Sequence, residues 1–312
     1  MSLKCSGQGQ GKLILFGEHA VVYGEPAVAC SLPLGAEATI EASERPDWVI
    51  ADEKEAMIGD AAVQKAGRLL LKEFNLEPEG LAIRVRLSVP IGAGLGSSAA
   101  MAVAMARAAA CLARVSEEEQ GERIFRAVSA SEGVFHGKAS GIDQQAAMGS
   151  GFFAFRRRET SVEVTPLEVP PARWLVARVA PSASTSAMVE GVSRLRERYP
   201  SRVGGIFREI SALSYDGIEA LKAGDWEKVG ALMNINQGFL NALGVSSPRL
   251  EEACVAAREA GALGAKLTGA GGGGCVIALA GEDSESLQKA LQSRGDVYSF
   301  ELPGVGAGSH QD

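Results

Sequence analysis

Residues 90–100, PIGAGLGSSAA, are the stretch that decides the fold of this chain. Before them, residues 82–88 alternate apolar and polar side chains, which predicts a half-buried strand. After them, residues 97–114 are mostly alanine, the strongest helix former, and this segment is apolar on nearly every side. We therefore expect a strand, a glycine-rich turn and a buried helix, in that order.

The turn between this strand and this helix is a candidate anion site. Gly92, Gly94 and Gly96 let the backbone adopt positive φ and approach a ligand closely. The free N–H groups at the start of the helix, together with the helix dipole, attract a phosphate group. The hydroxyls of Ser97 and Ser98 could bind a phosphate oxygen or a metal ion; a tight turn with serine N-caps is the alternative.

Two better-known nucleotide-binding loops do not fit the sequence. A Walker loop needs Ser or Thr after its lysine, but Leu13 follows Lys12, and Ser6 stands where the first glycine should be. A dinucleotide-binding GxGxxG loop needs an acid about 20 residues further on. The glycine spacing at 92–96 differs from that pattern, and the alanine-rich helix contains no acid.

Two other segments carry glycine and polar residues together. Residues 266–275, KLTGAGGGGC, leave a nearly bare backbone, which favours close approach to a ligand or to the first loop; a flexible hairpin is the alternative. Residues 11–24, GKLILFGEHAVVYG, place Lys12 at a short strand and Glu18 and His19 after it. One such residue alone would usually be structural, but three around a strand end favour a pocket.

Two carboxylates lie between these segments, in SEGVFHGKASGID. Glu132 belongs to an otherwise apolar helical stretch, so it needs a lysine, a hydrogen-bond donor or a metal as partner. Asp143 starts a short helix at 142–148, where the helix N-terminus keeps it ionised; a plain N-cap is the alternative. An anion loop, a serine, a lysine and two acids are together what phosphoryl transfer requires.

The composition narrows the class of protein. The chain has 312 residues, with 38 acidic and 31 basic side chains and a formal charge of −7, which argues against a nucleic-acid binder. No apolar stretch approaches the roughly 20 residues of a membrane span, and the N-terminus has no signal-peptide core. Five scattered cysteines without CxxC predict reduced, mostly buried thiols in a cytoplasmic protein.

Strands precede helices in each half of the chain, which indicates an α+β fold. The charged and then proline-rich segment 156–173 predicts a domain boundary, with domains at 1–168 and 169–312. Ser116 with Glu119 predicts a capping box that opens a helix toward His136. Further strands are expected at 12–16, 26–32, 36–42, 151–155, 174–179, 264–268, 275–280 and 297–302, and further helices at 60–74, within 185–261 and at 283–294, before a disordered tail.

With these motifs the sequence resembles the GHMP kinase family over nearly its whole length. GKLILFGEHAVVYGEPAVA at 11–29, PIGAGLGSSAA at 90–100 and KLTGAGGGGC at 266–275 follow the order of the three family motifs. The first motif and HGKASGID at 136–143 are most similar to the branch of the family that phosphorylates mevalonate. The resemblance implies an N-terminal domain of the ribosomal protein S5 domain 2-like type, an α/β C-terminal domain and an active site in the cleft between them.

The resemblance also implies a role for each matching residue. Asp143 would be the catalytic base and Lys12 its electrostatic partner, while Ser98 and Glu132 would bind Mg²⁺. The substrates would be ATP and mevalonate, phosphorylated at its C5 hydroxyl. The phosphates would be wrapped by Gly92, Ala93, Gly94, Leu95, Gly96 and Ser97, with Ser98, and the substrate side formed by Glu18, His19, Thr185, Gly269, Ala270 and Gly271, with the glycines continuing to Gly273.

Three departures from the family pattern concern substrate affinity more than reaction type. Gly9-Gln10 replaces the usual Ala-Pro, Ala139 replaces a proline, and no basic residue stands beside Thr185. Another GHMP kinase, such as a phosphomevalonate or sugar kinase, is an alternative, but 156–158 is the only obvious arginine cluster. A nucleotide-sensing protein is a second alternative, although it should have lost the catalytic residues. The oligomeric state, homodimer included, stays open.

Overall fold

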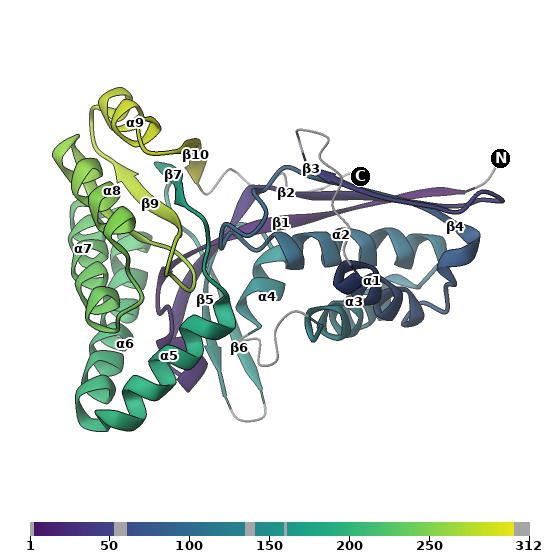
Figure 1. Ribbon diagram of the computed structural model, residues 1–312, viewed down its shortest axis with the longest axis horizontal. Coiled ribbons are helices and arrows are strands. Elements are labelled where there is room, and N and C mark those ends of the chain that lie inside the picture. Colours follow the sequence, from purple (N-terminus) through teal and green to yellow (C-terminus); the bar gives the residue numbers. More distant parts are fainter. Residues whose placement is uncertain (1–2, 53–60, 135–140, 159–160, 303–312) are drawn as a thin grey trace. The chain divides into compact units, whose positions relative to one another are not determined.

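The computed structural model describes residues 3–52, 61–134, 141–158 and 161–302. The chain forms two compact units (Figure 1), each described here by itself. The first unit comprises residues 1–12, 31–91 and 95–149, and the second comprises 13–30, 92–94 and 150–312. Strands β1 (Lys4–Phe16) and β2 (Ala27–Ala42) each contribute residues to both units. The domain boundary expected at 168 stays a prediction.

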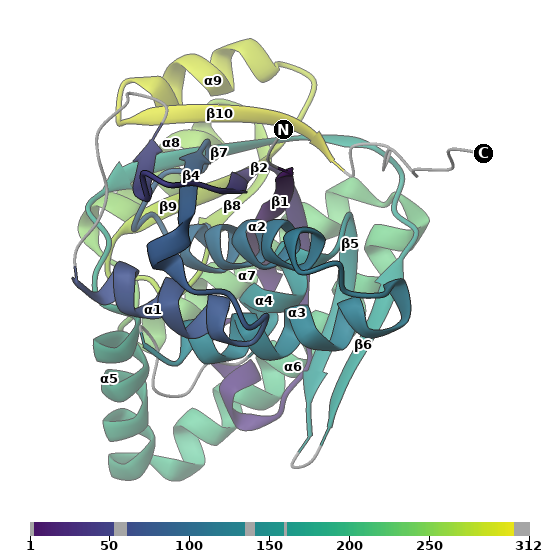
Figure 2. The ribbon, with the colours of Figure 1, turned by 90° about the vertical axis from the view of Figure 1, so that its right-hand side faces the viewer.

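The first unit combines a group of helices with part of a β-sheet. Strand β4 (Leu81–Leu87) pairs with β2 antiparallel and with β3 (Asp47–Asp52) parallel. Four helices pack against one another in this unit (Figure 2), with α2 in contact with the other three. These helices are α1 (Ala61–Lys72), α2 (Ser97–Leu112), α3 (Glu117–Glu132) and α4 (Ile142–Met148), and the 3₁₀ turn η2 (Pro78–Gly80) precedes β4.

The alanine-rich helix α2 is buried along most of its length, as the sequence predicts. Its small side chains allow strand β1 to lie directly against it. A side chain at Gly9 would meet the backbone of Ala100, and one at Gly7 would come within 2.7 Å of the Ala108 nitrogen. The alternating glycines of β1 therefore match the alanines of α2, and this contact brings the strand that ends near Lys12 onto the helix that starts at Ser97.

The second unit contains an antiparallel four-stranded sheet in the order β10-β7-β9-β8. Trp174 and many aliphatic side chains are buried in its core, where α7 and α8 pack on β8. Its remaining pair, β5 and β6, continues from the first part of β2. The elements are η1 (Ala20–Tyr23), β5 (Phe152–Arg157), β6 (Val162–Leu167), β7 (Ala172–Ala180), α5 (Thr185–Arg198), α6 (Pro200–Ala223), α7 (Trp226–Ala242), α8 (Pro248–Glu259), β8 (Ala262–Leu267), β9 (Gly274–Ala280), α9 (Ser284–Gln292) and β10 (Asp296–Leu302).

The structure corrects several expected elements. The strands expected at 26–32 and 36–42 are one continuous strand, because Leu34 and Gly35 keep an extended backbone between them. Strands β3 and β6 were not expected, since charged and proline residues mask their pattern. Ser116 does precede α3, but only its carbonyl accepts the Glu119 N–H, at 3.2 Å, so the capping box is wrong. The expected tail at 303–312 lies outside the described residues.

The thiols differ from the expectation in one respect. Cys5 and Cys111 form a disulfide, with Cα atoms 5.8 Å apart, so these two residues are not reduced thiols. They meet because the start of β1 lies beside the end of α2, a proximity across 106 residues that spacing alone does not reveal. Cys30, Cys254 and Cys275 are buried, as expected, and burial raises the pKa of the Cys254 thiol to about 12. Among the described helices, none is long and apolar enough to cross a membrane.

Candidate active site

Lys12 and Asp143 form an ion pair in the first unit. Lys12 Nζ lies 3.0 Å from Asp143 Oδ1, and the two side chains are 6% and 33% exposed. Lys12 is fixed in β1 by the bond from its N–H to the Leu95 carbonyl, at 2.9 Å. Asp143 is in the first turn of α4, which starts after Gly141 at φ 90°. The Asp143 carboxylate is therefore partly exposed to solvent, while Lys12 is buried and its backbone is bonded to Leu95.

Glu132 completes a cluster with these two residues. It is the last residue of α3, it is only 5% exposed, and its Oε1 has no hydrogen-bond partner among the described residues. Burial, followed by the nearby charge of Asp143, raises the pKa of Glu132 to about 7. A hydrogen bond with Ser98 and the charge of Lys12 act in the opposite direction. We call Lys12, Ser98, Glu132 and Asp143 the first-unit cluster.

Ser98 and Glu132 fit a divalent cation. A buried carboxylate oxygen without a partner, beside a hydroxyl, is an incomplete site for a hard positive ion. The described residues contain no group of three or more His, Cys, Asp or Glu that could hold a metal by themselves. Magnesium in phosphoryl-transfer sites commonly takes one or two carboxylates and completes its shell with substrate phosphates and water, so this small donor set suffices.

The glycine-rich loop has the geometry expected of an anion site. Gly92, Gly94 and Gly96 have φ angles of 65°, 78° and 77°, which glycine adopts without strain. Gly96, not a serine, is the N-cap of α2, and no side chain of the described residues caps that end. The serine N-caps considered as an alternative are therefore not formed. Ser97 and Ser98 begin the helix, where free backbone N–H groups are able to bind an anion.

A second ion pair lies in the second unit. Lys266 Nζ contacts Glu18 Oε1, and these side chains are 0% and 1% exposed. Asn236 Nδ2 donates to Glu18 Oε2 at 3.1 Å, and Lys266 Nζ also donates to the Leu267 carbonyl at 2.6 Å. Both oxygens of Glu18 are thus bound by protein groups. We call Glu18 and Lys266 the second-unit pair.

His19 follows Glu18 in a strained backbone conformation. Its φ is 61°, which is uncommon for a residue other than glycine. Its Nε2 donates to the Ala270 carbonyl at 2.9 Å. Burial lowers the pKa of the His19 imidazole, more than the Ala270 bond and the Glu18 charge raise it. The neutral ring is therefore favoured, with its hydrogen-bonded nitrogen protonated.

The third motif approaches the first glycine-rich loop within the second unit. A side chain at Gly269 would come within 3.1 Å of the Gly94 carbonyl, so glycine is required where these backbones meet. Thr268 Oγ1 donates to the Ile14 carbonyl at 3.1 Å and accepts the Ile14 N–H at 3.0 Å. The Gly272 N–H donates to the Val245 carbonyl at 2.7 Å. The motif is the loop between the antiparallel strands β8 and β9, and these hydrogen bonds tie it to neighbouring segments of the second unit.

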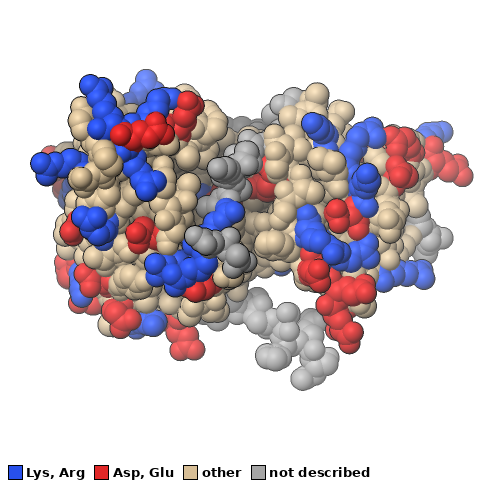
Figure 3. Space-filling view, turned by 90° about the horizontal axis from the view of Figure 1, so that it is seen from below, with Lys and Arg blue, Asp and Glu red and all other residues tan. Residues whose placement is uncertain are grey.

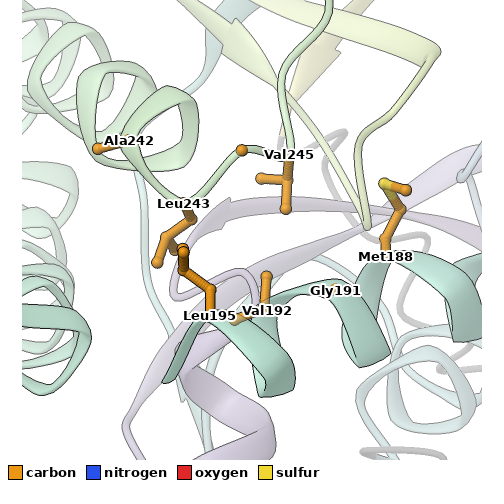
Figure 4. Close-up of a pocket in the computed structure, with 8 residues that line it drawn as sticks. Met188, Gly191, Val192, Leu195, Ala242, Leu243 and Val245 are labelled. Atoms are coloured by element: carbon orange, nitrogen blue, oxygen red, sulfur yellow. The ribbon is translucent and has the colours of Figure 1, made fainter. Parts of the chain in front are cut away.

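Thr185 stands apart from these contacts. It is the first residue of α5 and is exposed, and Ser184 caps the helix by accepting the Ala187 N–H at 3.4 Å. On the same helix Met188 lies behind Gly272 of the third motif. An apolar pocket is next to it (Figure 4), lined by α5 and the turn after α7. The residues that line this pocket are Met188, Gly191, Val192, Leu195, Ala242, Leu243, Gly244 and Val245. None of them is charged, so the pocket is not a phosphoryl-transfer site.

Sequence reasoning missed the partners of the predicted residues. Lys266 and Asn236 bind Glu18, and neither was a candidate. The signal for Lys266 was present, because a lysine inside an apolar strand segment needs a carboxylate. No comparable signal pointed to Asn236, which lies on a long helix among other amides.

Comparisons with known proteins identify the family of the chain. The family models of the GHMP kinases match residues 61–152 (N-terminal domain) and 218–297 (C-terminal domain). A mevalonate kinase of Thermococcus gammatolerans is 35% identical over 309 residues, covering 91% of both chains. One of Archaeoglobus fulgidus is 37% identical over 273 residues, covering 86% of this chain and 90% of that one.

This chain belongs to the mevalonate kinase family of GHMP kinases. A crystal structure of L. major mevalonate kinase in complex with R-mevalonate superposes with a TM-score of 0.85 and 26% identity, covering 96% of each chain. The two-domain α+β fold that the motifs implied is thereby confirmed. Membership of the mevalonate kinases also agrees with the first motif, which separated this branch from the sugar kinases at the level of sequence.

Proposed function

We propose that this protein is a mevalonate kinase, which transfers the γ-phosphoryl group of ATP to the C5 hydroxyl of mevalonate and releases 5-phosphomevalonate and ADP. One observation carries the proposal: Lys12 and Asp143 lie 3.0 Å apart next to a buried, incompletely bonded Glu132, in a chain 35% identical to a mevalonate kinase over 91% of its length. The same arrangement disfavours a nucleotide sensor, which has no need of an acid–base pair.

Asp143 is proposed as the general base. One third of its side chain is exposed, so a substrate hydroxyl can reach a carboxylate oxygen and transfer its proton there. Lys12 would stabilise the negative charge that develops on the oxygen and on the transferring phosphoryl group. The backbone of Lys12 is bonded to the Leu95 carbonyl and its ammonium already lies 3.0 Å from Asp143, so the proposed roles require little reorganisation of the lysine.

Mg²⁺ is proposed at Ser98 and Glu132, where it would neutralise charge on the phosphates of ATP. The N–H groups from Gly92 through Ser97 are proposed to bind the phosphates, because the loop glycines have positive φ and the start of α2 is uncapped within the described chain. Glu132 must be ionised to bind the cation, and the cation itself would favour that ionised form.

The substrate side is proposed to consist of His19, Thr185 and the backbone at 269–271. Glu18 is proposed to support this side of the site without touching the substrate, since both of its carboxylate oxygens are already bound within the protein. The partners are therefore small molecules. On the described surface of the face in Figure 3, basic and acidic side chains are interspersed, which gives no extended basic area for nucleic acid. We keep the cytoplasm as the proposed compartment, since ATP is the phosphoryl donor.

The decisive experiment measures ADP release by the purified protein with Mg-ATP and, in turn, mevalonate, phosphomevalonate, galactose and homoserine. Turnover with mevalonate alone is the expected result. Turnover with another acceptor would keep the phosphoryl-transfer site but overturn the substrate assignment. If no ADP were released with any of the four acceptors, while ATP still bound, the result would contradict the proposed kinase activity on these alcohols.

A further inference from the structure

Arg107 connects the two elements that carry the catalytic pair. It lies on α2, where its Nη1 donates to the Gln8 carbonyl in β1 at 2.7 Å and its Nη2 donates to the Met148 carbonyl at the end of α4 at 2.8 Å. Strand β1 continues from Gln8 to Lys12, and α4 carries Asp143 in its first turn. We propose that Arg107 is a positioning residue that fixes the distance between Lys12 and Asp143, an inference that rests on the proposed kinase function.

On strand β1 this contact lies between two other anchors, the Cys5–Cys111 disulfide and the bond from the Lys12 N–H to the Leu95 carbonyl. Gly7 and Gly9 face the helix, so strand and helix meet backbone to backbone. At Gly7 and Gly9 no side chain interlocks with the helix, and the crosslink between the two elements lies at the start of the strand, where Cys5 is joined to Cys111. A hydrogen bond is directional, so the guanidinium on the Gln8 carbonyl fixes the orientation of the strand in the segment between Cys5 and Lys12.

Helix α4 depends on the same guanidinium at its far end. The helix has only seven residues, too few to be stable without tertiary contacts. A cation at the last carbonyl satisfies an otherwise unpaired acceptor and favours the helix dipole. Ser31 Oγ supplies a second anchor by donating to the Ala146 carbonyl at 2.8 Å, so α4 should shift rather than unfold when Arg107 is removed.

The bonding of Arg107 also argues against a merely solvated side chain. Within the described chain no carboxylate lies at ion-pair distance from it, and its two hydrogen bonds go to backbone carbonyls of two different elements. Burial lowers the pKa of the Arg107 guanidinium, an unfavourable environment that these two bonds compensate. The planar fork of arginine can serve two carbonyls at once, which an ammonium group cannot do as well.

Arg123 offers a matched control in the same unit. It lies on α3, its Nη2 donates to the Glu73 carbonyl at 2.6 Å, and its guanidinium stacks on Phe74 with 5.4 Å to the ring centre. It therefore joins two elements through a backbone carbonyl, as Arg107 does. However, these contacts are with Glu73 and Phe74 just after α1, and not with the elements that carry Lys12 and Asp143.

The test compares Arg107→Met, Arg107→Lys and Arg123→Met in the full-length protein. For Arg107→Met we expect kcat to fall by about 10–100-fold, with KM for mevalonate and for ATP changed less than about twofold, because a small displacement of reacting groups affects the chemical step. Arg107→Lys should recover part of kcat by keeping one carbonyl bond. Arg123→Met should keep kcat within about twofold of wild type even if its thermal stability drops.

A second measurement does not depend on turnover. Hydrogen–deuterium exchange in Arg107→Met should accelerate at residues 5–12 and 142–149, and in Arg123→Met at residues 70–76 instead. A wild-type kcat in Arg107→Met, or faster exchange spread over the whole unit, would overturn the inference. If wild-type protein did not phosphorylate mevalonate, the proposed function would fail, while the two exchange patterns would still decide whether Arg107 holds both elements.

Discussion

Two buried lysines, Lys12 and Lys266, each form an ion pair with a carboxylate, and the two pairs differ in their access to solvent. In the first-unit cluster, Lys12 and Asp143 lie 3.0 Å apart with Asp143 33% exposed. In the second-unit pair, Lys266 and Glu18 are in contact at 0% and 1% exposure. The first arrangement leaves one carboxylate side for a substrate, and the second leaves none. The same two chemical groups are therefore accessible to a small molecule in one place and sealed within the protein in the other.

The difference has a physical basis in desolvation. A buried ion pair costs more to remove from water than an open one, and it persists only where additional hydrogen bonds satisfy both partners. Asn236 and the Leu267 carbonyl supply those bonds to the second-unit pair. The adjacent His19 keeps φ at 61°, a strained conformation that needs such surroundings. We infer that the sealed pair holds His19, whereas the open pair meets the substrate.

The largest expected effect is on turnover at the open pair. Asp143→Asn removes the proposed base and should lower kcat by about 10²–10⁴-fold, because an amide cannot take the substrate proton. ATP binding should change little, and the unfolding midpoint should fall only modestly, since the amide oxygen of the asparagine can still accept a hydrogen bond from the buried Lys12 ammonium. Steady-state kinetics and thermal unfolding measure the two quantities. A wild-type kcat in this variant would remove the assignment of Asp143 as base.

The next largest effect is on stability at the sealed pair. Lys266→Met leaves Glu18 buried without its cation and should lower the free energy of unfolding by about 3–5 kcal/mol. Lys12→Met is the matched control, because its partner can be solvated, and its stability loss should be clearly smaller. Urea unfolding at pH 7 compares the two variants. Equal losses would mean that exposure does not distinguish the pairs.

Removing both charges of the sealed pair tests its purpose. The double variant Glu18→Leu/Lys266→Met should recover most of the lost stability, to within about 2 kcal/mol of wild type, since no unpaired charge stays buried. If the pair positions His19, KM for mevalonate should nevertheless stay raised. A double variant with restored stability and a wild-type KM would reduce the pair to a purely structural role.

The smallest effect is a pH dependence at His19. Burial holds the pKa of this imidazole below its ordinary value. Below about pH 6.5 the imidazole is therefore protonated in the unfolded chain but still neutral in the folded protein. Stability from this group is therefore present above that pH and is lost as the pH falls toward the folded pKa. His19→Gln should flatten the part of the urea-unfolding free energy that changes between pH 7.5 and 5.5. If the unfolding free energy changed equally with pH in the wild type and in the variant, the result would contradict this role of His19.

Much of the candidate site was predictable because its residues act locally. Glycines at 92, 94 and 96 adopt the positive φ that the loop requires, and the alanine segment forms the buried helix α2. Asp143 begins α4 as expected. In contrast, the strand at Val162–Leu167 was missed, because a proline and exposed charges hide a strand whose pairing with β5 decides its conformation.

The sequence by itself determined the glycine loops, the helix that follows the first of them, and the set of acids, lysine and serine that phosphoryl transfer needs. Only the tertiary structure decided which groups meet: Glu18 with Lys266 across 248 residues, Cys5 with Cys111 across 106, and Arg107 with Gln8 and Met148. Local conformation follows from the preferences of neighbouring residues, which a linear pattern records. Long-range pairing depends on how elements pack, and a linear pattern contains no distances between them.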